Sequence, residues 1–291
     1  MTAAASDAGA RAHAEQIARG HDENFPVAFM LAPRDVRADI RTIYAYCRVT
    51  DDIGDAGDAT RDERVAMLDA WEDDLLRCWG GAPNDPVLLA LQGVVRRRGL
   101  DPEPFRALIE ANRMDQRISR WQTHDDLIEY CRHSAIPVGR MVLGVLGIHD
   151  PRCEHLSDAT CAGLQLVNFW QDIRRDLDER DRVYLPTEDM AIFGVTVDDL
   201  REHQASPAVR ELIRMEVWRA RALLIEGAPL RAEVPRRVRP DIAMFTSGGL
   251  WVCDAIARQK FDTIARRPAP GKSGRARMAG AVLVGAVRGV R

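Results

Sequence analysis

Apolar side chains recur every three or four residues along most of this chain, which is the spacing of helices that bury one face. No stretch shows the convincing alternation of a half-buried strand. The pattern predicts helices over residues 36–55, 59–78, 86–98, 104–118, 125–147, 158–178, 207–226 and 241–267. Breaks rich in glycine and proline separate several of them, and none is long enough to divide domains. We therefore expect an all-α, single-domain bundle.

Composition narrows the possible partners. Hydrophobic residues make up 46% and charged residues 29% of the 291 residues, as in ordinary globular proteins. A net charge of -3 provides no general basic surface, so we expect no nucleic-acid partner. The six cysteines show neither zinc spacing nor a disulfide framework, which fits a reducing cytoplasm.

The ends differ in character from the predicted domain, residues 21–270. Residues 1–20 have no continuous apolar segment, so we expect a flexible tail rather than a signal peptide. Residues 271–291 form a basic and apolar tail whose apolar run is too short to span a bilayer. One hypothesis is that this tail makes peripheral contact with the inner face of a membrane.

The first strong helix carries charge on its inner surface. Apolar residues along this helix are spaced four, three and four residues apart. Four further side chains have the same spacing and lie on the inner part of the same surface: Tyr44, Arg48, Asp51 and Asp55. Aspartate pairs four residues apart also occur at 35/39, 58/62 and 69/73, where we expect solvated faces. Position on the apolar stripe distinguishes Asp51 and Asp55 from those pairs.

The helix over 158–178 is apolar on nearly every side, yet a polar stripe runs along it at 3-4-4 spacing: Gln165, Asn168, Asp172 and Asp176. One interpretation is an internal salt-bridge network with arginines such as Arg174 or Arg175. The other is a metal site, because Asp and Asn oxygens suit Mg²⁺, which completes its coordination with water and phosphate oxygens. Two such clusters predict a diphosphate bound with Mg²⁺.

Four segments carry a family resemblance. NFPVAFMLAP, IYAYCRVTDDIGD, YCRHSAIPVGR and NFWQDIRRDLDERDRVYLP, in that order over residues 24–186, resemble the squalene/phytoene synthase family, and RQKFDTIARRP continues the similarity. The resemblance implies the all-α isoprenoid-synthase bundle with a central active-site cavity.

The resemblance also implies roles for individual residues. Asp51 and Asp55 match the family's first aspartate-rich motif, and the second comprises Asn168, Asp172 and Asp176. Both motifs would hold Mg²⁺ against diphosphate. Basic positions near the diphosphate match Arg48, Arg182 and Arg266, and pocket-lining positions match Tyr44 and Gln165. Arg182 and Arg266 are also compatible with being ordinary surface arginines.

Among the subfamilies, the motifs look most like bacterial hydroxysqualene synthases of hopanoid pathways. Relatives that condense two prenyl chains commonly have serines and a tyrosine where this chain has Glu23, Asn24 and Arg132. We therefore expect presqualene diphosphate and water to give hydroxysqualene and diphosphate. The alternative is a head-to-head prenyltransferase, namely a presqualene diphosphate, dehydrosqualene or phytoene synthase. Asp181 is a further departure, because the family normally has glycine there, and it predicts a less flexible loop before Arg182.

Other classes of protein fit less well. The run Gly271-Lys272-Ser273 lacks the glycine and the preceding strand of a phosphate-binding loop. No GxGxxG opens a βαβ unit, so we expect no nicotinamide cofactor. A non-enzymatic helical scaffold is the remaining alternative, and it would leave the inward carboxylates unexplained.

Overall fold

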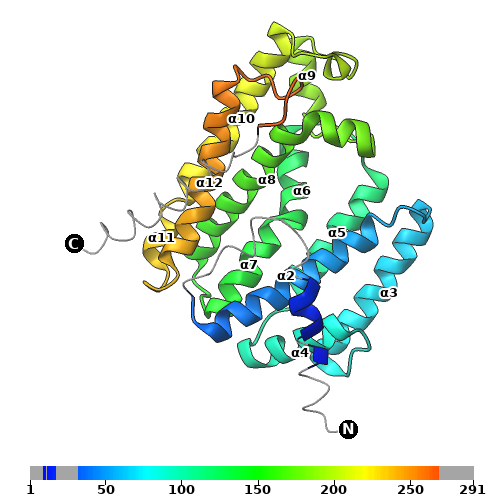
Figure 1. Cartoon of the computed structure of the whole chain (residues 1–291), viewed down its shortest axis with the longest axis vertical. Helices are drawn as coiled ribbons and strands as arrows, with labels where there is room; N and C mark the ends of the chain where they lie inside the picture. Colours follow the sequence, from blue (N-terminus) through cyan, green and yellow to red (C-terminus); the bar gives the residue numbers. More distant parts are fainter. Residues whose placement is uncertain (1–8, 11, 18–31, 269–291) are drawn as a thin grey trace. The chain divides into compact units, whose positions relative to one another are not determined.

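The computed structural model describes residues 9–10, 12–17 and 32–268 (Figure 1). The predicted all-α fold is confirmed: the described residues contain helices and one isolated bridge between Arg120 and Val183, but no strand. They form two compact units, one from the described parts of 1–117 and 133–154, the other from 118–132 and 155–268. The predicted single domain over 21–270 stays a prediction. The 271–291 tail lies outside the described residues, as does most of 1–20.

The first unit is built around α2. Its helices are α2 (Arg34–Gly54), α3 (Arg61–Gly80), α4 (Pro86–Arg98), α5 (Glu103–Arg117) and α7 (Ile136–Leu146). Helix α2 contacts each of the other four. On its buried face the hydroxyl of Tyr46 donates to the carbonyl of Phe105 at 2.8 Å, and the indole of Trp71 donates to Thr50 at 2.9 Å. These buried bonds fix the rotation of α2 and hence the direction of its polar side chains.

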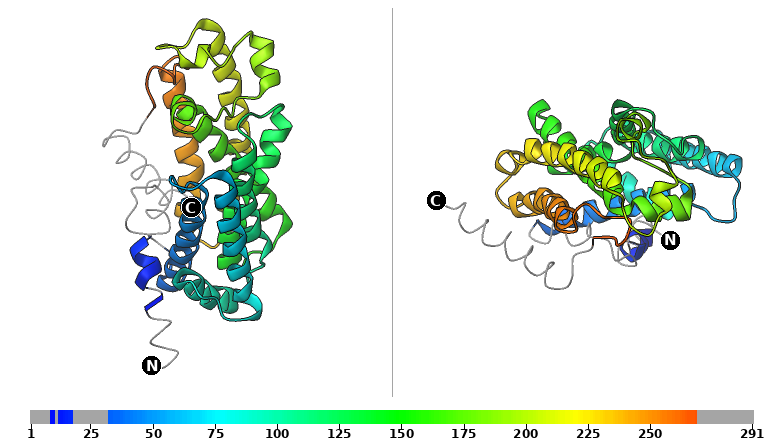
Figure 2. Two further views of the ribbon diagram at one scale, coloured as in Figure 1. Left: turned by 90° about the vertical axis from the view of Figure 1, so that its right-hand side faces the viewer. Right: turned by 90° about the horizontal axis from the view of Figure 1, so that it is seen from above.

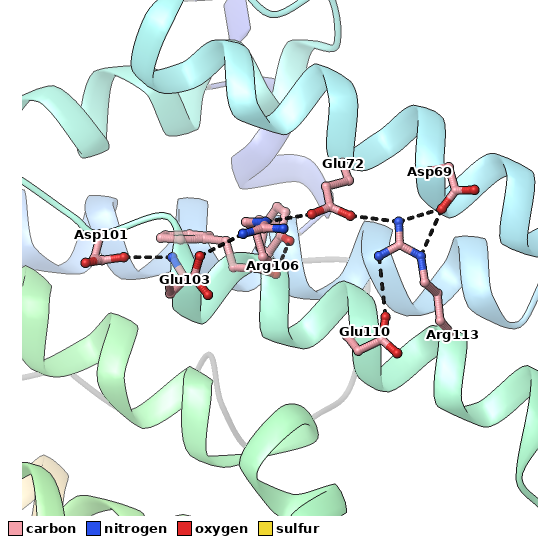
Figure 3. Close-up of polar contacts among 9 residues, drawn as sticks. Asp69, Glu72, Asp101, Glu103, Arg106, Glu110 and Arg113 are labelled. Atoms are coloured by element: carbon pink, nitrogen blue, oxygen red, sulfur yellow. Dashed lines mark hydrogen bonds and ion pairs between the residues drawn. The ribbon is translucent and has the colours of Figure 1, made fainter.

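A ladder of ion pairs joins α3 to α5 (Figure 3). Glu72 on α3 accepts from Arg106 and Arg113 on α5, both at 2.7 Å. Arg113 also reaches Asp69 at 2.6 Å. An isolated surface pair contributes only about 0.2–1 kcal/mol, but Glu72 and Arg113 are largely buried and share partners. The ladder therefore helps to set the position of α5 beside α2.

Asp39 on α2 is buried, so the predicted solvated face at 35/39 is wrong for this residue. Its carboxylate accepts from Arg97 at 2.6 Å and from Arg98 at 2.7 Å, both on α4. Nothing in the local sequence of α2 indicates these distant cations. The predicted exposure is confirmed for Asp35 and for the other two pairs, Asp58, Asp62, Asp69 and Asp73.

The second unit contains a long helix, α8, and a set of shorter elements. Its elements are most of α6 (His124–Ser134) and of α8 (Pro151–Arg180), then α9 (Thr187–Phe193), the 3₁₀ turn η1 (Asp199–Arg201), α10 (Pro207–Gly227), α11 (Leu230–Glu233) and α12 (Arg239–Arg258). Helices α10 and α12 lie side by side (Figures 1 and 2). Close packing depends on glycine: a Cβ on Gly163 of α8 would lie 2.9 Å from Leu224 of α10, and one on Gly249 of α12 would lie 2.8 Å from it.

Three of the predicted helices differ from the observed ones by more than a few residues, and the one predicted over 158–178 begins earlier, at Pro151. The predicted helix over 125–147 is two helices, α6 and α7, because Pro137 in the first turn of α7 cannot donate a backbone hydrogen bond. The helix predicted over 241–267 ends at Arg258, after which Lys260 and Phe261 adopt positive φ values of 53° and 60°. No helix in the described ranges is both long and apolar enough to cross a membrane.

A charged cluster is buried inside the second unit. Glu216 on α10 is fully buried, and Arg219 bridges it to Asp189 of α9 at 3.0 and 2.6 Å. His124 lies 3.9 Å from the other oxygen of Glu216. Burial raises the pKa of Glu216 to about 8, against the opposing effect of Arg219, so the folded chain keeps a proton there at neutral pH.

The cluster predicts a pH dependence of stability. The unfolded chain loses the Glu216 proton near pH 4.5 and the folded chain near pH 8. Between these values the folded state binds more protons, so the free energy of unfolding falls as pH rises, by at most about 1.4 kcal/mol per pH unit. Glu216→Gln should remove this contribution. Denaturant titrations at pH 5, 6, 7 and 8 should therefore show that the free energy of unfolding of the variant increases relative to that of the wild type as pH rises.

The matched control is Glu211→Gln, an exposed change on the same helix, which should leave the slope unchanged. Equal slopes for the wild type and Glu216→Gln would show that Glu216 is ionised in the folded chain.

Candidate functional site

In the first unit, the predicted site residue Asp51 combines a hydrogen bond from a neutral amide with a raised pKa. Its Oδ1 accepts a hydrogen bond at 3.1 Å from the side-chain amide of Asn112 on α5. Burial raises the pKa of Asp51 to about 7, and the Asn112 bond opposes this rise. The carboxylates of Asp55 and Asp115 raise it further, whereas Arg48 lowers it. Negative charge at Asp51 is therefore costly, and an added cation would stabilise it.

Asn112 is held in place by its fit against α2. Its amide also donates to the carbonyl of Leu108 at 3.2 Å. The Asn112 side chain occupies the space beside Gly54, where a Cβ would lie 2.0 Å from its Oδ1. The adjacent Gln116 donates to the carbonyls of Gly54 and Asn112, both at 3.0 Å. The glycine in the DDIGD run thus makes room for the residue that orients Asp51.

The other predicted residues of α2 lie at different depths. Tyr44 is buried, and Asp55 is exposed at the end of the helix. Arg48 is half-buried and donates to Asp52 at 2.7 Å. Asp52 faces solvent and was not among the predicted site residues. The exposure of these side chains therefore increases along the helix, from the buried ring of Tyr44 to the exposed carboxylate of Asp55.

In the second unit, the predicted polar stripe of α8 is more accessible than the apolar positions around it. Leu166, Val167 and Trp170 are buried, whereas Gln165 and Asp172 are half-buried and Asn168 is exposed. Asp176, the last member, is 8% exposed. Burial and the nearby Asp172 carboxylate raise the pKa of Asp176 to about 6, against Arg180, Arg175 and Arg182.

A tight turn after α8 brings Arg182 back beside Asp176. The backbone N–H of Arg182 donates to the carbonyl of Asp176 at 3.1 Å, and Arg182 is buried rather than on the surface. Asp181 has a φ of 50°, a conformation that favours glycine. Arg120 donates to the Asp181 carbonyl and, at 2.8 Å, to its carboxylate. The bonds from Arg120 thus stabilise an aspartate at a position where the backbone favours glycine.

Aromatic rings adjoin this acidic end of α8. Phe169 and Tyr184 stack with ring centroids 3.7 Å apart, and they line one small pocket together with Asp176 and Arg182. Tyr130 lies 5.9 Å from the Tyr184 ring and 6.2 Å from that of Phe169. Both stacked rings are buried, so they form an aromatic wall beside the Asp176 carboxylate.

The basic side chain that pairs with Asp172 is that of Arg267, which lies after α12. Arg267 donates from both Nε and Nη2 to the two Asp172 oxygens, the second at 3.0 Å. Arg266, which the sequence predicts to be a basic residue of the site, is exposed. Arg174 and Arg175, the candidate partners of an internal network, pair instead with Asp178 and Glu179. Sequence reasoning missed Arg267 and Asn112, because neither lies on a predicted polar stripe.

The chemistry of these donors fits Mg²⁺. Among the described residues, no three His, Cys, Asp or Glu side chains already converge as a metal cage. Mg²⁺ does not require one, since it commonly takes one or two carboxylates and fills its octahedron with water and phosphate oxygens. The half-buried Asp172 with its guanidinium partner and the raised pKa of Asp51 both indicate carboxylates that a cation would stabilise.

Comparisons with known proteins agree with the predicted family. The family model described as squalene/phytoene synthase matches residues 18–277. The chain belongs to the squalene/phytoene synthase family. A hydroxysqualene synthase from Rhodopseudomonas palustris is 38% identical over 73% of this chain and 72% of its own length. A phytoene synthase from Arthrospira platensis is 33% identical over 87% and 85%.

Solved structures agree in fold. A squalene synthase from Alicyclobacillus acidocaldarius is 42% identical and matches with a TM-score of 0.83 over 88% of this chain and 96% of that one. A dehydrosqualene synthase is 26% identical and matches with a TM-score of 0.86 over 96% and 97%. The chain is therefore an all-helical isoprenoid synthase.

The Gly54 contact predicts a local packing defect. Gly54→Ala should force Asn112 from its position and lower the free energy of unfolding by about 1–3 kcal/mol, as over-packing does. Gly57→Ala is the matched control, because nothing lies within 4 Å of a Cβ there. Chemical denaturation measures both.

A double-mutant cycle then tests the cause. In an Asn112→Ala background the contacts with Oδ1 and Cγ are gone and only the one with Cβ at 3.2 Å remains, so Gly54→Ala should cost much less. Equal costs in both backgrounds would show that Asn112 is not what requires glycine at position 54.

Proposed function

We propose that this chain is a hydroxysqualene synthase that converts presqualene diphosphate and water to hydroxysqualene and diphosphate with Mg²⁺. The observation that carries the proposal is the likeness to hydroxysqualene synthases from Rhodopseudomonas palustris and Sinorhizobium fredii, at 38% and 34% identity over about three quarters of the chain. The motif departures at Glu23, Asn24 and Arg132 favour the same subfamily, although the first two lie outside the described residues.

In the proposed reaction the bond between carbon and the diphosphate oxygen breaks, and its electron pair leaves with the diphosphate. The cyclopropylcarbinyl cation rearranges, water forms the new carbon–oxygen bond, and one proton is released. When bound at the two aspartate motifs, Mg²⁺ would supply the positive charge that neutralises the leaving diphosphate.

The residues of the chain contribute charge and shape. Mg²⁺ would be held by Asp51 on α2 and Asp55 directly after it, and by Asn168, Asp172 and Asp176 on α8. Tyr44 and Gln165 would line the pocket, and Arg48, Arg182 and Arg266 would bind the diphosphate. Arg182 is supported by its burial beside Asp176. The stacked Phe169 and Tyr184 would stabilise positive charge on the hydrocarbon through their ring faces.

The second candidate is a head-to-head prenyltransferase that joins two prenyl diphosphates. The phytoene synthase from Arthrospira platensis matches more of this chain than the hydroxysqualene synthases do, which favours keeping this candidate. Both reactions release diphosphate, so the two differ in the substrate that enters rather than in the acidic motifs. Neither proposed route uses a nicotinamide cofactor. Contact of residues 271–291 with the inner face of a membrane stays a hypothesis about residues outside the described part, and a cytoplasmic location stays a prediction.

Removing either key carboxylate should abolish most turnover. Asp51→Asn and Asp172→Asn each keep the size of the side chain and remove its charge, so we expect diphosphate release to fall at least about 100-fold, as when transition-state charge stabilisation is lost. Circular dichroism should show that the helices remain. Turnover is measured as diphosphate released from presqualene diphosphate with Mg²⁺.

Asp58→Asn is the control for this pair, because Asp58 is exposed near the end of α2, and it should act like the wild type. Asp69 is a poorer control than its exposure suggests, since it bonds Arg113. Full activity in either Asp51→Asn or Asp172→Asn would remove that residue from the proposed site.

Three parallel incubations separate the candidate reactions. Presqualene diphosphate with Mg²⁺ and without NADPH should give hydroxysqualene, whereas farnesyl or geranylgeranyl diphosphate alone should give little product. Product analysis by mass spectrometry reads the outcome. Efficient condensation of two farnesyl or two geranylgeranyl diphosphates would instead identify the chain as a prenyltransferase.

A further inference from the structure

The segment after α12 is pinned to the second unit at its start. Asp262 accepts from the backbone N–H groups of Ala205 and Ala265 at 3.1 and 3.0 Å, and from the Arg210 guanidinium at 2.6 Å. Thr263 and Ile264, which follow it, are buried. The position of residues 262–264 is therefore determined by hydrogen bonds and apolar packing.

The end of the same segment lies against the acidic stripe of α8. The Arg267 guanidinium pairs with both oxygens of Asp172, and the amide of the neighbouring Gln171 donates to the carbonyl of Pro268. Two parallel N–H···O bonds from one planar guanidinium are stronger and more directional than a single contact. About half of the Arg267 side chain is still exposed, so it can move away without disturbing the core.

This pairing competes with a metal ion. A cation that coordinates Asp172 needs at least one of the two oxygens that Arg267 occupies, and it would meet a second positive charge there. Arg267 leaves readily only if another anion is available for its guanidinium. A diphosphate, which carries several negative oxygens, is such an anion.

We infer that Arg267 is a built-in counter-ion of Asp172, which excludes divalent cations from this carboxylate until a diphosphate draws its guanidinium away. The inference rests on the proposed function, because it assigns Asp172 to the metal site. It adds an order of events: cation binding at Asp172 is weak without diphosphate and strengthens with it. By thermodynamic linkage, the cation strengthens diphosphate binding by the same factor.

Manganese binding tests the inference without turnover. Free Mn²⁺ is measured by electron paramagnetic resonance during titration of the full chain, with and without inorganic diphosphate. Without diphosphate, Arg267→Gln should bind Mn²⁺ at least about fivefold more tightly than the wild type, which is the low end of typical coupling between sites. The gain in Mn²⁺ affinity on adding diphosphate should be correspondingly smaller in this variant.

Arg237→Gln is the control, since it removes the same charge from an exposed side chain elsewhere in the second unit. It should change the diphosphate-free affinity less than twofold, on the order of the effect of a screened surface charge. Arg267→Lys keeps the charge but loses the two-pronged contact, so its affinity should fall between those of the wild type and Arg267→Gln.

The outcomes separate this inference from the proposed function. Absence of Mn²⁺ binding to the wild type even with diphosphate would overturn both. Diphosphate-dependent binding in the wild type, with Arg267→Gln unchanged in the absence of diphosphate, would overturn the counter-ion role alone. Equal tightening by Arg237→Gln would also overturn it, because the effect would then come from general charge rather than from the contact with Asp172.

Discussion

A carboxylate removed from water needs a cation, and the two units meet this requirement in different ways at different aspartates. Asp39 is neutralised within the fold by Arg97 and Arg98. Asp51 accepts a hydrogen bond from the neutral amide of Asn112, and both burial and the neighbouring carboxylates raise its pKa. Asp172 is paired with an arginine that is half exposed. The first is an internal ion pair, whereas we propose that the other two accept an external cation.

The rest of the structure supports these carboxylates. The ion-pair ladder between α3 and α5 positions α5, which carries Asn112 to Asp51. In the second unit, the turn at Asp181 and its bonds to Arg120 place Arg182 beside Asp176. Contacts between helices and within turns thus determine where these charged side chains lie, and the proposed reaction depends on their charge.

The sequence predicted the helices well because apolar periodicity is a local signal. It failed where the environment of a side chain depends on a residue far away in the sequence. The cations that pair with Asp39 lie on α4, and Asn112, which bonds Asp51, lies on α5. It also failed at Pro137, where a single residue ends a periodic pattern that continues on both sides. The candidate carboxylates could be selected because aspartates on apolar stripes conflict with their surroundings. Arg267 could not, since adjacent arginines at 266 and 267 look alike in sequence.

The account depends most on one proposal: the charge of Asp51 lowers the free energy of unfolding, and a bound cation and diphosphate compensate for it. Thermal unfolding of Asp51→Asn at pH 8, with and without Mg²⁺ plus inorganic diphosphate, tests it directly. Asparagine can still accept from Asn112 but carries no charge. We therefore expect the variant to be more stable than the wild type without ligands and to lose the stabilisation that Mg²⁺ and diphosphate give together. A variant that is less stable than the wild type, yet retains the full ligand-induced shift, would show that Asp51 serves the fold instead.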